Sequence, residues 1–346
     1  MSSVPRIYAL FVALFFSMTA LSIPSTSWAE VIDEGAQEQS RMDMSWWSPR
    51  YLVDYGLVVG GIAGYVIGED ITPRQQAMIG PSYDPTNPVL VFESQTVGKT
   101  HLEERVEETV PTVWIHRLVA MGGFFVAGLE GAELAAGGGS AHEFHEAFVG
   151  YAETVAITAT ITSMTKPFVG RLRPDFGERA LRYHCTWDDQ ADQYGAYCDG
   201  YRDHPLGDSR EEGLELIDDG QRSFISGHSS HSFNIFGYTA LLVGGRYVWG
   251  QDASTTSRGL GIATQAAMLG TATFIAGSRV YDGRHHVSDT VVGTVVGLGI
   301  ANASYWRRFH RDGSLRQRSG DASTTSASLS AQPTAHGPTL SIAIQF

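Results

Sequence analysis

Three short segments of the chain hold basic, histidine and acidic residues at spacings that could support chemistry on a phosphate. They are Lys166-Pro167-Phe168-Val169-Gly170-Arg171-Leu172-Arg173-Pro174, then Ser226-Gly227-His228-Ser229, and then Ser278-Arg279 followed after five residues by His285 and after three more by Asp289. Three cations that converged, Lys166, Arg173 and Arg279, could neutralise the equatorial oxygens of a phosphoryl group during its transfer. Each of them alone would be an ordinary surface charge or ion-pair partner.

The second and third segments supply groups for acid–base and nucleophilic steps. Ser226 and the backbone N–H of Gly227 are expected to open a helix, where amide donors favour an anion, and His228 in the same turn could protonate a leaving oxygen. If a helix begins near His285, Asp289 is its neighbour on one face. The carboxylate could then fix the imidazole tautomer and leave the other ring nitrogen free to attack phosphorus.

A single histidine at a helix end is more often a capping or surface residue, so the joint pattern carries the weight. The four fixed identities of the third segment would match by chance in a chain of this length about once in a thousand sequences. Two further segments in the right order reduce that frequency much more. The combination therefore points to a phosphate-handling site.

Together the segments resemble the signature of the type 2 phosphatidic acid phosphatase superfamily, which includes bacterial class A acid phosphatases and vanadium haloperoxidases. That signature reads Lys-x6-Arg-Pro, Pro-Ser-Gly-His and Ser-Arg-x5-His-x3-Asp. The resemblance implies that His285 is the nucleophile, that His228 is the general acid and that Asp289 orients His285. It implies no metal and no cofactor. The residues that it implies for phosphate binding are Lys166, Arg173, Ser226, Gly227 and Arg279.

One position departs from this signature, and two further histidines lie beside it. Ile225 precedes Ser226 where the family usually has proline, which would pre-set the turn that enters the helix; its loss removes no catalytic group. His231, one turn after His228, is interpreted as a structural or supporting residue. The side chain of His286 is expected to point away from the site.

The N-terminal residues have the composition of an export signal. Arg6 is followed by the apolar run 7–20, and Ser27-Trp28-Ala29 places small residues where a signal peptidase reads them. Cleavage is expected after Ala29, with an uncleaved membrane anchor as the alternative. The two cysteines, Cys185 and Cys198, are expected to form a disulfide in an oxidising compartment.

Six apolar, glycine-rich stretches of helical length predict an all-α fold, a single bundle of about six core helices. A polar arm, 30–50, precedes this domain (51–310), and an acidic insert, 175–222, which the disulfide would clip, is interpreted as functional or a lid. The tail, 311–346, is rich in Ser and Thr and predicted to be disordered, ending in a strand-like segment at 340–346. The stretches are 51–68, 112–137, 144–166, 230–249, 259–277 and 287–306.

The leading hypothesis is a metal-independent phosphatase that hydrolyses a phosphate monoester or a diphosphate through a phosphohistidine. The contexts around Arg173 and His285 resemble those of lipid phosphatases more than those of soluble acid phosphatases, which favours a lipid-linked substrate over a soluble one. A vanadium-dependent haloperoxidase, tested by vanadate-dependent halide oxidation with peroxide, and a non-catalytic anion-binding envelope protein are the alternatives. The formal net charge of −13 argues against a nucleic-acid partner, which would require a basic face.

The expected location is the periplasm or cell envelope, with a possible association with the membrane. Residues 55–68 are only 14 uncharged residues, fewer than the roughly 20 that a span needs. Glu130, Glu133 and Glu153 also lie inside later stretches, where charges are costly in lipid. These features favour a periplasmic domain over a polytopic protein.

Overall fold

In a computed structural model of the chain, the residues that can be described are those of the bundle, the insert in part, and two terminal strands. The expected export signal (1–29) and nearly all of the expected polar arm (30–50) lie outside them. The described residues are 49–73, 76–84, 111, 113–136, 138–187, 197–198, 201, 205–251 and 253–316, with the backbone of 326–334 and 337–345.

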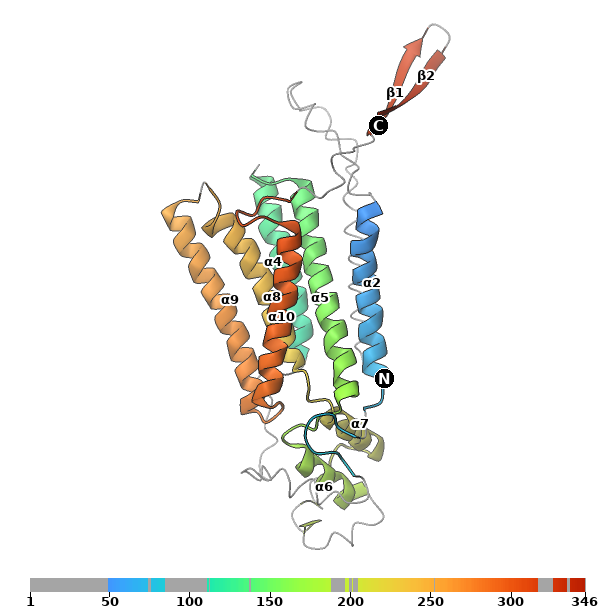
Figure 1. The fold of residues 1–346 in the computed structure, drawn as a ribbon, viewed down its shortest axis with the longest axis vertical. Helices are drawn as coiled ribbons and strands as arrows, with labels where there is room; N and C mark the ends of the chain where they lie inside the picture. Colours follow the sequence, from blue (N-terminus) through green and yellow to red (C-terminus); the bar gives the residue numbers. More distant parts are fainter. Residues whose placement is uncertain are drawn as a thin grey trace. The chain divides into compact units, whose positions relative to one another are not determined.

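Six long helices account for the six apolar stretches, so the prediction of an all-α bundle is confirmed (Figure 1). A turn of π-helix, Gly244–Val248, extends the fourth of them. In chain order the long helices are α2 (Pro49–Asp70), α4 (Val113–Ala135), α5 (Ala141–Val169), α8 (Gly227–Val243), α9 (Thr255–Tyr281) and α10 (Val287–Arg308).

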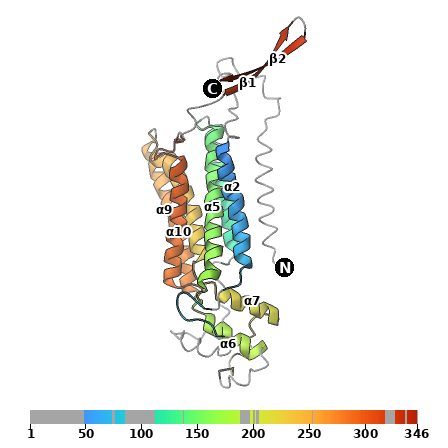
Figure 2. The same cartoon turned by 45° about the vertical axis from the view of Figure 1, so that its right-hand side comes forward.

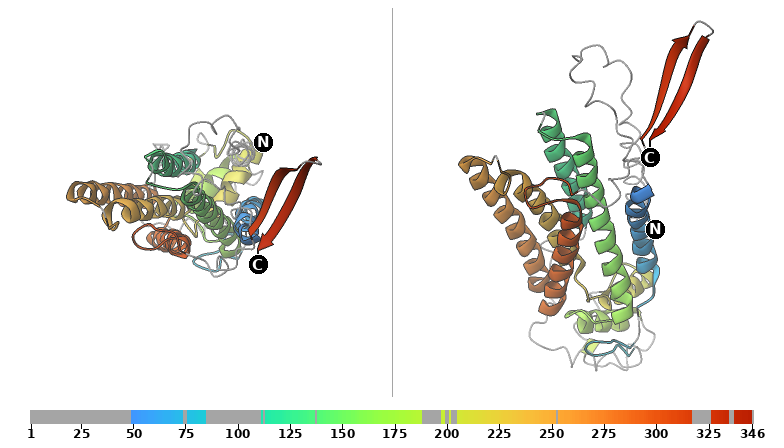
Figure 3. Two further views of the ribbon diagram at one scale, coloured as in Figure 1. Left: turned by 90° about the horizontal axis from the view of Figure 1, so that it is seen from above. Right: turned by 45° about the horizontal axis from the view of Figure 1, so that its top comes forward.

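Helix α8 is the centre of the bundle. It packs against α4, α5, α9 and α10, and all but three of its residues are buried. Small residues permit the close approach, because a Cβ at Gly297 of α10 would lie 2.2 Å from the carbonyl oxygen of Ser230 on α8. The grouping of α5, α9 and α10 is visible in Figure 2, and further views are given in Figure 3.

Helix α2 packs on α5 through glycines. A Cβ at Gly61 would lie 2.8 Å from that of Ala156, and one at Gly64 would lie 2.6 Å from Thr160 Cγ2. Gly60 has no atom within 4 Å of its Cβ position, because it lies on the face of α2 turned away from α5.

Four helices, α2, α4, α9 and α10, are long and apolar enough to cross a membrane. Their outer faces expose large apolar side chains such as Leu52, Phe124, Phe274 and Val295. Exposed apolar surface of this extent marks an interaction with lipid or another protein.

The expectation that α2 is too short to span is wrong, because α2 is long and apolar enough and Asp54, one of its three acidic residues, does not face outward. Asp54 is only 2% exposed, and its carboxylate lies 2.9 Å from Arg307 and 3.5 Å from Arg308. Glu153 pairs with the same two arginines, and Glu130 pairs with Arg246 at 2.7 Å. These charges therefore lie inside the protein, where they do not argue against a membrane.

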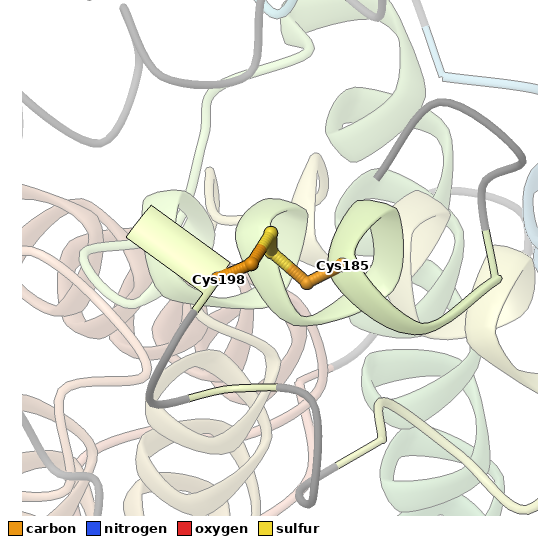
Figure 4. The surroundings of a disulfide bond; sticks show 2 residues. All are labelled: Cys185 and Cys198. Atoms are coloured by element: carbon orange, nitrogen blue, oxygen red, sulfur yellow. A yellow bond between two sulfur atoms is a disulfide. The ribbon is translucent and has the colours of Figure 1, made fainter. Parts of the chain in front are cut away.

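The insert between α5 and α8 contains two short helices, α6 (Phe176–Trp187) and α7 (Arg210–Gly220). A small apolar core holds them together; it includes Leu172, Phe176 and Ile217. The predicted disulfide is present, with the Cα atoms of Cys185 and Cys198 5.3 Å apart (Figure 4), inside the normal range for a disulfide. The bundle, the insert and this bond match the expected fold class.

The start of the expected tail is part of the folded domain. Leu315 forms an isolated antiparallel bridge with Phe309, and a Cβ at Gly245 would lie 2.8 Å from Gly313 Cα. The ordered domain therefore extends past residue 310, to 316. Farther on, β1 (Ser326–Thr334) pairs antiparallel with β2 (Gly337–Gln345), and β2 contains most of the segment that alternates apolar and polar residues.

Candidate active site

The up-and-down course of the bundle brings the three segments to one end, the lower end in Figure 1. Helices α5 and α9 finish there, and α8 and α10 begin there. The backbone N–H of Ser226 donates to the carbonyl oxygen of Asp289 at 3.2 Å. A Cβ on Gly227 would lie 3.5 Å from Lys166 Nζ. One residue from each segment is thus in contact with a residue of another.

The first segment leaves α5 at Gly170, whose φ of 61° ends the helix. Glycine adopts this left-handed conformation without the steric cost of a Cβ. The chain then turns across the end of the bundle, where the N–H of Arg173 donates to the carbonyl oxygen of Gly220 at the end of α7. Lys166 thus stays on the helix while Arg173 lies on the loop that leads to α6.

The second segment starts α8 as predicted, with Ser226 as the N-cap and Gly227 as the first helical residue. The hydroxyl of Ser226 accepts from the N–H of Ser229 at 3.4 Å. His228 is 6% exposed, and its Nε2 atom has no hydrogen-bond partner within the described residues. A buried ring nitrogen without a partner is unusual, and it leaves His228 available to a bound group.

Ile225 fills the position before Ser226 where proline was expected. It is 4% exposed, and its Cγ2 would lie 3.3 Å from a Cβ on Gly293 of α10. The Phe224–Ile225 peptide bond is cis. The side chain thus packs the entry of α8 against α10 and leaves Ser226 at the helix start.

The third segment crosses from α9 to α10 by a tight turn. Gly283 has a φ of 64°, and the N–H groups of Arg284 and His285 both donate to the carbonyl oxygen of Arg279, at 3.0 and 3.1 Å. His286 is the N-cap of α10, so His285 lies one residue before the cap. The five-residue spacing between Arg279 and His285 is the length of this turn.

His285 and Asp289 are close, but they are not in direct hydrogen-bond contact. His285 Nδ1 lies 3.9 Å from Asp289 Oδ2, which is too long for a hydrogen bond. The same Nδ1 atom lies 2.7 Å from the carbonyl oxygen of Ser223. A carbonyl only accepts, so Nδ1 carries the hydrogen and Nε2 is the basic nitrogen of the neutral ring.

The three cations of the site are buried to different degrees and have different partners. Arg279 is 1% exposed, and its NH1 atom lies 3.7 Å from Asp282. Arg173 is 7% exposed and donates to the side chain of Asp219 at 2.7 Å. Lys166 Nζ lies beside Gly227, as described above.

Burial, together with these charges, sets the protonation of the two histidines. Burial, then the charges of Arg279, His285, Lys166 and Arg173, lowers the pKa of His228 to about 2. Burial, opposed by Asp289, and the charges of Arg173, Lys166 and Arg279 lower the pKa of His285 to about 4. The same three cations therefore act on both rings, and both imidazoles are neutral at pH 7.

The neighbouring histidines serve the framework. His231 Nδ1 lies 2.8 Å from the carbonyl oxygen of Gly227. His286 Nε2 lies 3.1 Å from the carbonyl oxygen of Leu172, so this ring ties the first segment to the start of α10. Within the described part of the chain, no group of three or more His, Cys, Asp or Glu residues is placed to hold a metal ion.

Three residues at the site were not singled out from the sequence. Arg171 contacts Asp289, Ser223 contacts both His285 and Asp289, and Asp219 contacts Arg173. Arg171 and Ser223 each lie within three residues of a predicted site residue, and this closeness in the sequence could have indicated that they belong to the site. Nothing in the sequence links Asp219, near the end of the insert, to the first segment.

Comparison with known proteins gives a family for this arrangement. The sequence profile of the PAP2 superfamily matches residues 147–312, from near the start of α5 to just past α10, and this range contains all three segments. This part of the chain resembles the PAP2 superfamily, and we call it the PAP2 domain. The PAP2 domain therefore comprises the helices that hold the site, together with the insert that carries the disulfide.

Relatives of the PAP2 domain include named phosphatases. The chain is 29% identical over 177 residues to lipid phosphate phosphatase 2 of Arabidopsis thaliana, covering 49% of this chain and 52% of that protein. It is 28% identical over 166 residues to a probable diacylglycerol pyrophosphate phosphatase 1 of Schizosaccharomyces pombe, covering 48% and 54%. The chain thus spans about half the length of these two relatives.

A longer alignment joins the chain to a PA-phosphatase related-family protein of Dictyostelium discoideum. It is 26% identical over 279 residues, 77% of this chain and 82% of that protein. The similarity to this relative therefore extends beyond the PAP2 domain itself.

Proposed function

We propose that the protein is a phosphatase that uses His285 as its nucleophile and works without a metal ion. The observation that carries this proposal is the contact between His285 Nδ1 and the carbonyl oxygen of Ser223. It assigns the hydrogen to Nδ1 and leaves the Nε2 lone pair for attack on phosphorus. The names of the relatives, lipid phosphate phosphatase and diacylglycerol pyrophosphate phosphatase, support the same reaction class.

In the proposed first step, His285 Nε2 forms a bond to phosphorus as the bond between phosphorus and the leaving oxygen breaks. Lys166, Arg173 and Arg279 neutralise the equatorial oxygens, together with Ser226 and the N–H of Gly227 at the start of α8. The bound phosphate also offsets the cations around His228, which raises the pKa of that ring. His228 then takes up a proton and delivers it to the leaving oxygen.

In the second step, water opens the phosphohistidine. His228, now neutral, accepts a proton from the water as its oxygen bonds to phosphorus and the P–N bond breaks. The products are inorganic phosphate and a His285 ring ready for another cycle. The reverse use of His228 as base follows from microscopic reversibility.

We also propose that the substrate is a lipid-linked phosphate monoester or diphosphate at a membrane surface. The exposed apolar faces of α2, α4, α9 and α10 support membrane association. The disulfide in the insert, on the same side as the site, supports placement of this end in an oxidising compartment such as the periplasm. The expected export signal agrees with that placement.

The test is phosphate release by the full chain in detergent, with excess chelator, from a generic aryl phosphate and from a lipid phosphate. We expect turnover that survives the chelator and is lost in His285→Ala. His310→Ala is the matched control, because His310 lies beyond the far end of α10 and should leave the rate unchanged. Chelator-sensitive turnover, or turnover that survives in His285→Ala, contradicts the proposal.

A further inference from the structure

Ser223 lies at the junction of the three segments although it belongs to none of them. Its N–H donates to the carbonyl oxygen of Arg171 at 3.0 Å. Its carbonyl oxygen accepts from His285 Nδ1 at 2.7 Å, and its hydroxyl donates to Asp289 Oδ2 at 2.6 Å. Ser223 is completely buried, so all three bonds form away from water.

The carboxylate of Asp289 is already fully engaged by groups other than His285. Its Oδ1 atom accepts from Arg171 NH1 at 2.5 Å, and its Oδ2 atom accepts from Ser223 and from the N–H of His286 at 3.1 Å. Arg171 NH1 also donates to Ser288 Oγ at 2.7 Å. Asp289 therefore reaches the nucleophile chiefly through Ser223.

The contact between Arg171 and Asp289 also balances a buried negative charge. The side chain of Asp289 is 0% exposed and that of Arg171 is 17% exposed, so the carboxylate is buried and needs a counter-charge. Arg171 supplies it at Oδ1, whereas His285 lies nearest to Oδ2. The guanidinium offsets part of the negative charge that Asp289 would otherwise exert on the imidazole 3.9 Å away.

We propose that Arg171 and Ser223 are positioning residues for the nucleophile: Arg171 anchors Asp289, Asp289 anchors the Ser223 hydroxyl, and the Ser223 carbonyl holds His285. This inference rests on the proposed function of His285. It assigns Asp289 to the support of Ser223, in addition to its charge. It also gives a role to Arg171, inside the first segment, and to the buried Ser223, which lies outside all three.

Activity gives the first test. Ser223→Ala keeps the carbonyl but removes the hydroxyl, and Arg171→Gln removes the cation. Each should lower kcat by on the order of 10- to 100-fold, the cost of a small displacement of a reacting group. KM should change less than threefold, because neither side chain binds the phosphate. Arg171→Lys keeps the charge and should restore part of the loss.

The pH profile separates positioning from a merely structural effect. The charged and titratable groups around His285 are Asp289 from α10, Arg279 from α9, Lys166 from α5, Arg173 from the loop after α5, and His228 from α8. Without Arg171, the full negative charge of Asp289 acts on the imidazole of His285 and favours its protonated form. The acidic limb of kcat/KM should therefore move to higher pH. Asp289→Asn should move the limb the other way.

A matched control comes from the opposite end of the bundle. Arg246 also pairs with a buried carboxylate, Glu130, at 2.7 Å, with side chains 13% and 2% exposed. Arg246→Gln should lower the melting temperature much as Arg171→Gln does but leave the acidic limb in place.

The outcomes of this experiment distinguish the inference from the function on which it rests. An inactive wild-type chain would contradict the proposed function. An active wild type whose acidic limb is unmoved in both Arg171→Gln and Asp289→Asn would overturn the inference alone. Ser223→Ala with unchanged kcat would overturn it as well. Should Arg171→Gln fail to fold, the Arg171→Lys and Ser223→Ala profiles still decide the matter.

Discussion

Asp219, the penultimate residue of α7, holds Arg173 by two contacts. Its carboxylate accepts from Arg173 NH2 at 2.7 Å, and its own carbonyl oxygen accepts from Arg173 Nε at 3.0 Å. The charges of Arg173 and Arg179 lower the pKa of Asp219 against the effect of burial, so the carboxylate is ionised. The insert therefore fixes the orientation of a predicted phosphate-binding residue of the bundle.

Replacement of Asp219 should weaken phosphate binding. In Asp219→Ala the guanidinium of Arg173 loses a charge-assisted hydrogen bond, an interaction of about 1.5–3 kcal/mol. We expect KM, and the inhibition constant for inorganic phosphate, to rise about 10-fold. Glu215→Ala, an exposed acidic residue on the same helix, should leave both constants unchanged. An unaltered KM in Asp219→Ala would show that the insert does not orient Arg173 for binding.

The activity should have an acidic optimum. His285 must be neutral to attack, and its pKa of about 4 predicts that activity rises through this pH. The pKa of His228 is about 2, so this ring is neutral near pH 4. The proton for the leaving group therefore enters most readily with a singly protonated phosphate, whose second pKa is about 6. We expect a bell-shaped kcat/KM profile between about pH 4 and 6. A profile that still rises above pH 7 would contradict these assignments.

The ion cluster at the far end of the bundle should control stability and not catalysis. Arg308 contacts Asp54, Glu146 and Glu153, which belong to α2 and α5. Arg308→Met would leave buried carboxylates short of a counter-charge and should cost about 3–5 kcal/mol, seen as a lower melting temperature. Arg311→Met, at an exposed site, is the control. A large fall in the kcat of folded Arg308→Met protein would contradict the prediction that the cluster controls stability and not catalysis.

The disulfide should stabilise the insert locally. Cys185 and Cys198 are separated by 13 residues, and closing a loop of that size is worth about 3 kcal/mol. Cys185→Ser with Cys198→Ser should make the insert more sensitive to proteases and raise KM, because Asp219 belongs to the same unit. Resistance to proteolysis equal to that of the wild type would show that apolar packing alone holds α6 and α7.

Much of the fold could be predicted because each long helix is encoded by the pattern of residues within its own segment. Apolar runs of helical length predicted each long helix, and Ser226 and Gly227 were expected to open a helix, as they do at the start of α8. The approach of the three segments was inferred from their resemblance to a family, since spacing along a chain does not place helix ends together. The structure provides the up-and-down course that does so.

What could not be predicted depends on partners far away in the chain. From the sequence, Asp54 suggested a short, charged first helix. Its partners Arg307 and Arg308 lie some 250 residues farther along the chain, so the sequence around Asp54 gives no sign of them. Ser223 and Asp219 look like ordinary loop and helix residues, because their roles come from the groups that the fold places against them. Even His285 and Asp289, whose proximity was predicted, are joined through the carbonyl and the hydroxyl of Ser223, which no spacing rule reveals.

The most direct test of the account is to trap the phosphoenzyme. The full chain in detergent would be mixed with ³²P-labelled substrate in excess chelator, quenched in alkali within milliseconds, and digested for peptide mapping. The account predicts an alkali-stable, acid-labile label on the peptide that contains His285, and no label in His285→Ala. Label on another residue, or wild-type turnover with no labelled protein at any quench time, would contradict a phosphohistidine on His285.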